Sequence, residues 1–113
     1  MEISFMNGSK DNQLIVLPHG DLDLYASVAF CNAILPQFNR SKNHLVLDLS
    51  ATRYLDSSGV GTLIRLAQHA KTISGEVKLA NLTGTPRKVL EMSNIIRLFH
   101  VYSNVKEALT SWE

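Results

Sequence analysis

The feature that most constrains this chain is a change of hydrophobic period in the middle of the sequence. Residues 44–49, HLVLDL, form a short and nearly continuous apolar run, the pattern of a strand covered on both faces. From Ser57 to the stop signal Ser74-Gly75, apolar residues recur every third or fourth position, which predicts a helix. These residues are Val60, Leu63, Ile64, Ala67 and Ala70. A buried central strand followed by an amphipathic helix is typical of an α/β sheet.

The residues before this unit predict two strands and a helix. Residues 1–6 and 14–17 have strand patterns, and the turn-forming residues 7–12 separate them. A helix is predicted over 24–38 with Asp23 as its N-cap, and Pro36 should kink or end it close to Leu35. The apolar face predicted for this helix consists of Leu24, Val28, Cys31, Leu35 and Phe38.

The residues after this unit continue the alternation. Residues 77–80 predict a strand, and Thr85-Pro86 predicts a helix with proline in its first position. A weak last strand lies within 95–101, and Asn104 should cap a final helix. The residues predicted to face inward on these two helices are Val89, Leu90, Met92, Val105, Ala108, Leu109 and Trp112.

This order of elements predicts one α/β domain over residues 1–113. The sheet should be mixed but mostly parallel, with about five strands, an antiparallel pair at one edge, and about four covering helices. The junction between the strand at 44–49 and the helix that follows is a strand-to-helix loop, a position that such folds often use for function.

Composition excludes several classes of function. With 11 basic and 10 acidic residues and a net charge of +1, the chain lacks the clustered positive charge that nucleic-acid binding requires. The single cysteine, Cys31, cannot form an internal disulfide, and no apolar run approaches the roughly 20 residues of a membrane-spanning helix. No phosphate-binding loop is present, so we expect no bound cofactor. We therefore predict a cytoplasmic protein.

The junction itself, RYLDSSGVGT at 53–62, combines an acid, two serines and two glycines. Asp56 can cap the helix, and serines also suit a helix start. Gly59 and Gly61 should each cost the helix about 1 kcal/mol relative to alanine, so something should approach the backbone closely there. That neighbour could be a strand of the same chain or a partner protein, although glycines in the first turn favour surface access.

Catalysis and metal binding are both weakly supported. The serines do not lie in a G-x-S-x-G elbow, and the four histidines show no arrangement with an acid that would make one a base. His19, Asp21 and Asp23 alternate and could imitate a metal site, but Gly20 favours a turn followed by a helix cap. An exposed serine at a helix N-terminus could instead be phosphorylated, because backbone N–H groups and the helix dipole favour an anion there.

The sequence VLDLSATRYLDSSGVGTL at 46–63 resembles the signature of bacterial anti-sigma-factor antagonists, the small single-domain members of the STAS group. HGDLD at 19–23, GEVKLANL at 75–82 and PRKVLEMSNI at 86–95 resemble further family segments, so the likeness covers nearly the whole chain. Asp21 in place of the commoner glutamate, and Pro36 within a helix, depart from the family pattern.

The resemblance implies the STAS fold and a phosphorylation switch called partner switching. Its acceptor would be Ser57, modified by a cognate anti-sigma factor that is itself a serine kinase and restored by a PP2C-type phosphatase. The unphosphorylated form would bind the kinase and free a sigma factor, and phosphorylation would abolish binding. The resemblance further implies a docking surface, and we expect it to consist of Asp21, Asp23, Asp56, Ser57, Ser58, Gly59 and Gly61.

Three functions therefore remain open at this point. The first is the phosphorylatable antagonist, expected to be a monomer when free. The second is a scaffold or regulatory subunit that binds regardless of phosphorylation, since proteins with this fold also work in stressosomes, transporter assemblies and switches without sigma factors. The third is an enzyme, which the absence of a base, metal set or cofactor loop disfavours.

Overall fold

The computed structural model describes all residues, 1–113, as one sheet with its covering helices. The strands are β1 (Glu2–Asn7), β2 (Gln13–His19), β3 (His44–Asp48), β4 (Glu76–Ala80) and β5 (His100–Tyr102). The helices are α1 (Leu24–Ile34), α2 (Ser57–Thr72), α3 (Gly84–Met92) and α4 (Val105–Thr110), with a 3₁₀ turn, η1, at Ile96–Leu98. This order confirms the predicted number and alternation of elements.

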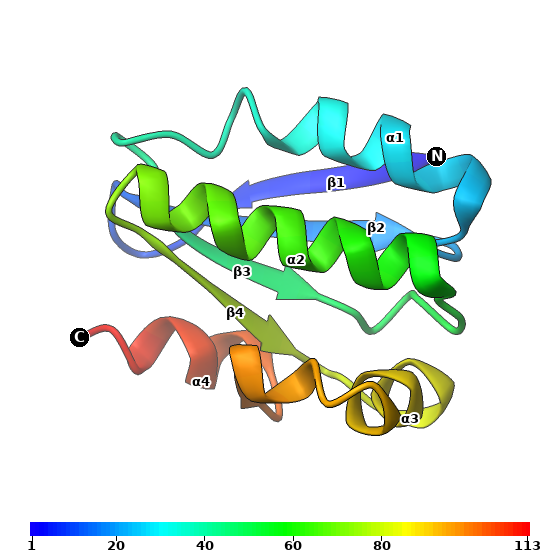
Figure 1. Ribbon diagram of the computed structural model, residues 1–113. Coiled ribbons are helices and arrows are strands. Elements are labelled where there is room, and N and C mark those ends of the chain that lie inside the picture. Colours follow the sequence, from blue (N-terminus) through cyan, green and yellow to red (C-terminus); the bar gives the residue numbers. More distant parts are fainter.

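The strands lie in the order β1-β2-β3-β4-β5, so the predicted central strand β3 occupies the middle of the sheet. β1 pairs with β2 antiparallel, and the other three pairs are parallel. The antiparallel edge pair and the mostly parallel sheet were both predicted. Parallel pairing matters for the site, because it brings the loops that follow β2 and β3 to the same edge of the sheet (Figure 1).

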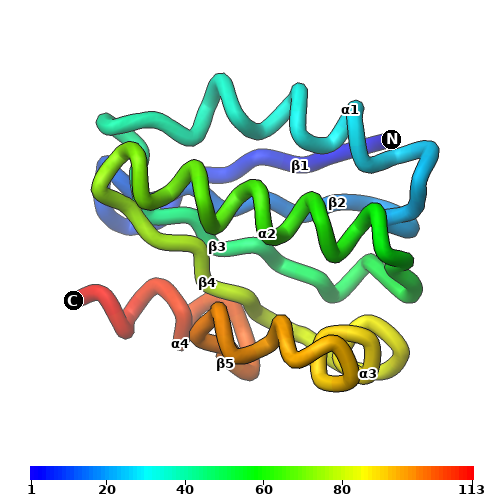
Figure 2. The backbone as a smooth tube through the Cα atoms, viewed as in Figure 1, coloured from blue at the N-terminus to red at the C-terminus, as the bar shows by residue number.

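The two faces of the sheet are covered by different helices. α1 and α2 lie side by side across one face, as the backbone trace shows (Figure 2), and Leu45 and Leu47 of β3 point into a core of 19 buried apolar residues there. Val46, between them, points to the opposite face and packs with Ala80 and with Ala108 of α4. No helix in the structure combines the length and the apolarity that crossing a membrane would require.

The predicted end of α1 is confirmed, but its predicted inward face is correct only in its second half. The helix ends at Ile34 with Leu35 as its C-cap, as Pro36 required. Cys31 and Phe38 are buried as predicted. Leu24 and Val28 are 65% and 66% exposed instead, and the other buried positions of α1 are Ser27, Phe30 and Ile34. Both sets have helical spacing, and the sheet takes the one that carries the larger pair, Phe30 and Ile34, which the predicted face left in solvent.

Three predictions about the last third of the chain also need correction. α3 has Thr83 rather than Thr85 as its N-cap residue, so Pro86 lies at the third helical position, where its missing N–H is still harmless. Met92 is 87% exposed instead of inward. The last strand is only His100–Tyr102, because η1 occupies the residues before it. Asn104 caps α4 as predicted, accepting from Glu107 N–H at 2.8 Å.

Candidate functional site at the serine junction

Backbone hydrogen bonds align the loops that precede α1 and α2. Leu22 and Leu55 form a parallel bridge beyond the ends of β2 and β3. Leu22 N–H donates to Tyr54 O at 3.0 Å, and Asp56 N–H donates to Leu22 O at 3.3 Å. Because Leu22 and Leu55 are themselves fully buried, the two helix starts are fixed beside each other at one edge of the sheet.

Two carboxylates occupy these helix starts. Asp23 Oδ1 accepts from the N–H groups of Tyr25 and Ala26, at 3.1 and 3.0 Å. Asp56 caps its own helix through Oδ1, which accepts from Ser58 N–H at 2.8 Å and Gly59 N–H at 3.2 Å. Its other oxygen, Oδ2, accepts from Leu24 N–H of α1 at 3.2 Å. Both predicted caps are confirmed, and Asp56 also ties the starts of α1 and α2 together.

The two glycines of the junction have different surroundings. Gly59 is buried, and a Cβ atom there would lie 2.2 Å from Leu22 O and 2.9 Å from the Cβ of Leu55. The close neighbour of Gly59 is therefore its own chain, and the predicted surface access at this position is wrong. A Cβ at Gly61 would meet nothing within 4 Å, so that glycine lines open space.

The serines are accessible to different degrees. Ser57, the first residue of α2, is exposed, whereas Ser58 is half-buried and its carbonyl accepts from Thr62 Oγ1 at 3.1 Å. Helix capping is performed by Asp56, so no hydrogen bond of the fold depends on the Ser57 hydroxyl. A phosphate on Ser57 would add negative charge directly beside Asp56 and next to the α1 start that Asp23 caps.

Asp21 lies on the same edge but is not joined to the serines. It is exposed and follows Gly20, whose φ of 113° makes the predicted turn. With His19, Asp23 and Tyr25 it lines a shallow hollow beside the start of α1. His19 hydrogen-bonds Ser4 Oγ at 2.8 Å, so this ring points back to β1. The alternating residues thus form a turn and a helix cap, as the sequence favoured.

A groove between α1 and α2 opens beside Ser58. It has a volume of about 410 Å³, and the exposed side chains of Leu24 and Val28 form the wall that α1 contributes. Tyr25, 90% exposed, adjoins this wall along α1. The groove is lined by Leu24, Ser27, Val28, Ser58, Gly61, Thr62 and Arg65. We name it the α1–α2 groove.

The sequence prediction missed most of the α1–α2 groove because it placed Leu24 and Val28 in the core. The available signal was the second periodic set on the same helix, in which Phe30 and Ile34 lie four positions apart. Had that set been assigned to the core, Leu24 and Val28 would have been left as exposed apolar residues beside a candidate modification site. Such residues are typical of protein-docking surfaces.

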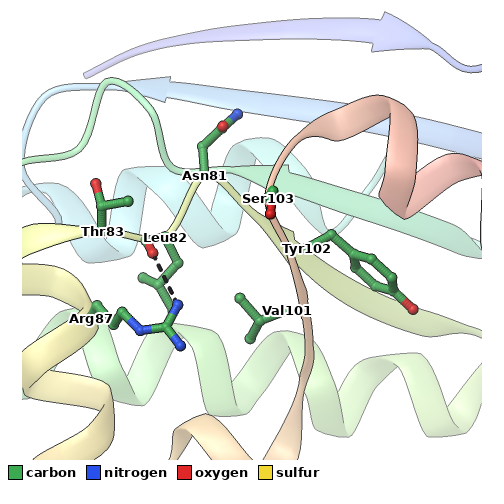
Figure 3. A pocket seen from close by; sticks show the side chains of 7 residues that line it. All are labelled: Asn81, Leu82, Thr83, Arg87, Val101, Tyr102 and Ser103. Carbon is green, nitrogen blue, oxygen red and sulfur yellow. Dashed lines mark hydrogen bonds between the residues drawn. The ribbon is translucent and has the colours of Figure 1, made fainter.

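A second hollow lies at the carboxyl ends of β4 and β5 but shows no comparable chemistry (Figure 3). It measures about 370 Å³ and is lined by Asn81, Leu82, Thr83, Arg87, Val101, Tyr102 and Ser103. Arg87 is already engaged, since its guanidinium donates to Leu82 O at 3.3 Å and pairs with Glu91 at 3.3 Å. None of the site residues that were predicted from the sequence lines this hollow. The candidate site is therefore the serine junction with the α1–α2 groove.

Comparison with known proteins identifies the family of the chain. The sequence pattern of the STAS domain matches residues 6–108, nearly the whole chain. The chain belongs to the STAS family. A STAS-domain containing protein of Pseudomonas aeruginosa is 31% identical over 101 residues, which are 89% of this chain and 99% of that protein. The anti-sigma F factor antagonist of Paenibacillus polymyxa is 28% identical over 101 residues, covering 88% of this chain and 86% of the relative.

Solved structures show the same fold. SpoIIAA, an anti-sigma factor antagonist of Bacillus, superposes in its unphosphorylated form with a TM-score of 0.82 at 19% identity, over 98% of this chain and 96% of SpoIIAA. Its phosphorylated form gives a TM-score of 0.72 at 20% identity, covering 97% of this chain and 100% of that one. The murine anion transporter Slc26a9 contains the fold as 18% of its length, with a TM-score of 0.80 at 17% identity over 91% of this chain.

Proposed function

We propose that this STAS domain is an anti-sigma-factor antagonist that acts by partner switching at Ser57. In its unphosphorylated form it binds a cognate serine-kinase anti-sigma factor through the serine junction and the α1–α2 groove, and the sigma factor is released. Phosphorylation of Ser57 by that kinase abolishes binding, and a PP2C-type phosphatase restores it. We place this exchange in the cytoplasm and assign it to residues 1–113 as a single monomeric domain that uses no cofactor, metal ion or catalytic residue.

One observation carries the proposal: Ser57 is exposed at the first position of α2, while Asp56 holds the helix cap. A kinase can therefore reach the hydroxyl, and the phosphate need not displace a fold contact. The positive end of the dipole of α2 also favours an anion, which offsets part of the repulsion from Asp56. The fold tolerates the modification, and the docking surface changes.

The change at the docking surface is mainly electrostatic. A phosphoserine carries about −1.5 to −2 charges at neutral pH, and it would lie beside Asp56 at a surface that continues into apolar Leu24 and Val28. Docking over Ser57 would have to desolvate this charge or place it against groups selected for a neutral hydroxyl. The released state therefore follows from local charge and hydration, without a change of fold.

The relatives support the regulatory assignment. The Paenibacillus relative is named an anti-sigma F factor antagonist, and SpoIIAA has been solved in both unphosphorylated and phosphorylated forms.

The hydrogen bonds of the four histidines support a function without serine hydrolase chemistry. His19 bonds Ser4, His44 bonds Asn12, His69 bonds Phe38 O and His100 bonds Glu76, so none is paired with the junction serines.

The test is phosphopeptide mapping after incubation with the cognate kinase and ATP, where the label should fall on Ser57. Ser57→Ala should keep kinase binding and abolish labelling, whereas Ser57→Asp should weaken binding at least about tenfold, roughly 1.4 kcal/mol. Ser41→Asp is the matched control, since it adds the same charge at an exposed serine outside the serine junction and the α1–α2 groove, and it should leave binding unchanged. Label on another residue while Ser57 stays unmodified would refute the proposal, as would a Ser57→Asp variant that unfolds.

The alternative is a scaffold or regulatory subunit that uses the same surface independently of phosphorylation. The scaffold function is kept as a candidate because the same fold occurs as one part of the anion transporter Slc26a9. The two functions separate in one experiment. The partner's affinity would be measured against the Ser57-phosphorylated and unphosphorylated domain, and equal affinities would establish the scaffold.

A further inference from the structure

The far end of the sheet holds a second cluster of functional groups, centred on Trp112. Its indole stacks on His44 with ring centroids 4.4 Å apart and planes 6° from parallel, and Nε1–H donates to Glu76 Oε1 at 3.0 Å. The Lys78 ammonium lies 4.1 Å from the centroid of the indole and donates to Ser111 Oγ. Lys78 itself is only 3% exposed. We call Trp112 with His44, Glu76 and Lys78 the Trp112 clasp.

The Trp112 clasp fastens α4 to the sheet. α4 covers little apolar surface, namely the small group formed by Val46, Ala80 and Ala108 with its partly buried neighbours. Glu76 and His44 are the first residues of β4 and β3, so the clasp lies at the edge of the sheet opposite the carboxyl ends that lead to the serine junction. The attachment of α4 therefore depends strongly on aromatic and charged contacts at this edge.

A chain of amide groups fixes His44 as a hydrogen-bond acceptor. Asn43 Nδ2 donates to the backbone oxygen of Ser74 at 2.9 Å, so its Oδ1 faces the other way. That Oδ1 accepts from Asn12 Nδ2 at 3.1 Å, and Asn12 Nδ2 also donates to His44 Nδ1 at 3.2 Å. Because the backbone oxygen can only accept, the whole chain is oriented, and Nδ1 of His44 meets a donor. This arrangement requires Nδ1 to be unprotonated.

The charged groups around His44 reinforce its neutral form on balance. Burial lowers the pKa of His44 below 6.5, the Glu76 carboxylate opposes this shift, and the Lys78 ammonium adds to it. Glu76 is shared with His100, whose Nδ1 lies 2.8 Å from its Oε2, and with the Trp112 indole. The ring of Trp112 already faces the Lys78 cation. A second cation stacked on that ring would be repelled by the first.

We infer that the Trp112 clasp is a proton-sensitive fastening, closed while His44 is neutral and released when His44 is protonated. Protonation places a donor against Asn12 Nδ2, adds a positive charge near Lys78, and so disfavours the closed stack. The pKa of His44 is lower in the closed state than the 6.5 of a free histidine. The clasp therefore contributes its full stability above about pH 6.5 and loses it as the pH falls through the lowered value. Release frees α4 from Val46 and Ala80.

The single tryptophan of the chain makes this inference directly measurable. Between pH 7.5 and 5 we expect the emission maximum of Trp112 to shift to longer wavelength, and its quenching by acrylamide to rise several-fold, with a midpoint below 6.5. Far-ultraviolet circular dichroism should retain most of its signal, since β1 to β5 and α1 to α3 do not depend on the clasp. The emission maximum and the acrylamide quenching are measured instead of the emission intensity. A protonated histidine can lower the intensity of a stacked indole even when the indole does not move.

Three variants decide whether His44 is the sensor. His44→Phe keeps an aromatic stack without a proton site and should abolish the transition, whereas His100→Gln, which removes the other ring beside Glu76, should retain it. Asn12→Asp replaces the donor facing Nδ1 by an acceptor and should raise the pKa of His44, followed by NMR, above 6.5. Unchanged Trp112 exposure down to pH 5 would overturn the inference, and so would an equal transition in His44→Phe. If His44→Phe fails to fold, a wild-type His44 pKa at or above 6.5 by NMR would overturn it alone.

Discussion

The two faces of the sheet are closed by different kinds of contact. Under α1 and α2, 19 buried apolar residues form one cluster, whereas under α4 only Val46, Ala80 and Ala108 do so. The second face compensates with the stacked, hydrogen-bonded and cationic contacts of the Trp112 clasp. The serine junction is thus mounted on a face that is closed mainly by apolar packing, while α4 is attached by groups whose charge can change.

The largest expected effect compares neighbouring residues of β3 that point to opposite faces. Leu47→Ala opens a cavity in the apolar cluster and should lower the free energy of unfolding by about 2–5 kcal/mol. Val46→Ala should cost less, since it removes two carbon atoms instead of three and lies in a much smaller buried apolar cluster. Urea unfolding at pH 7.5 measures both. An equal or larger loss for Val46→Ala would contradict the ranking of the two faces.

The next effect concerns the glycine that packs on the chain itself. Gly59→Ala places a methyl group 2.2 Å from Leu22 O, so either α2 or the Leu22–Leu55 bridge must move. We expect a loss of about 1–3 kcal/mol in the free energy of unfolding, together with weaker binding of the kinase because both helix starts shift. A Gly59→Ala variant with wild-type stability would show that the backbone around Leu22 can shift at little cost in free energy.

Local signals explain why much of the fold was predictable from sequence. The buried run 44–49, the change of period at Ser57, and the caps Asp23 and Asp56 all depend on residues within one turn or one strand of each other. The contacts that escaped prediction join distant parts of the chain. Lys78 meets Ser111 33 residues later, and Gly59 is glycine because of Leu22, so no local pattern marks either.

The first half of the predicted inward face of α1 was wrong for a different reason. Two sets of residues have helical spacing, and only the shape of the sheet decides between them. The candidate site was thus predictable at the caps Asp23 and Asp56 and at Ser57, which depend on neighbouring residues. It was not predictable at the α1 wall of the α1–α2 groove, which depends on how α1 is rotated. Leu24 and Val28 are therefore the part of the proposed docking surface that only the structure reveals.

A smaller effect tests the charged contact of the second face. Lys78→Met fills a similar volume and keeps a favourable sulfur contact with Trp112, so the free energy of unfolding at pH 7.5 should change by less than about 1 kcal/mol. Because Lys78 lowers the pKa of His44, its removal should raise that pKa and move the release of Trp112 to higher pH. The midpoint is read from the tryptophan emission maximum. A midpoint that stays in place would exclude Lys78 from the fastening.

The smallest effect on stability separates Gly61 from Gly59. A methyl group at Gly61 meets no atom within 4 Å, so Gly61→Ala should raise the free energy of unfolding by about 0.5 kcal/mol through helix propensity. The same methyl group narrows the α1–α2 groove beside Ser58. The affinity of the unphosphorylated domain for its kinase partner should therefore fall, although the domain is slightly more stable. Urea unfolding and isothermal titration calorimetry measure the two changes. Unaltered affinity would show that the partner contacts Ser57 without entering the groove, and the docking surface would then be confined to the helix starts.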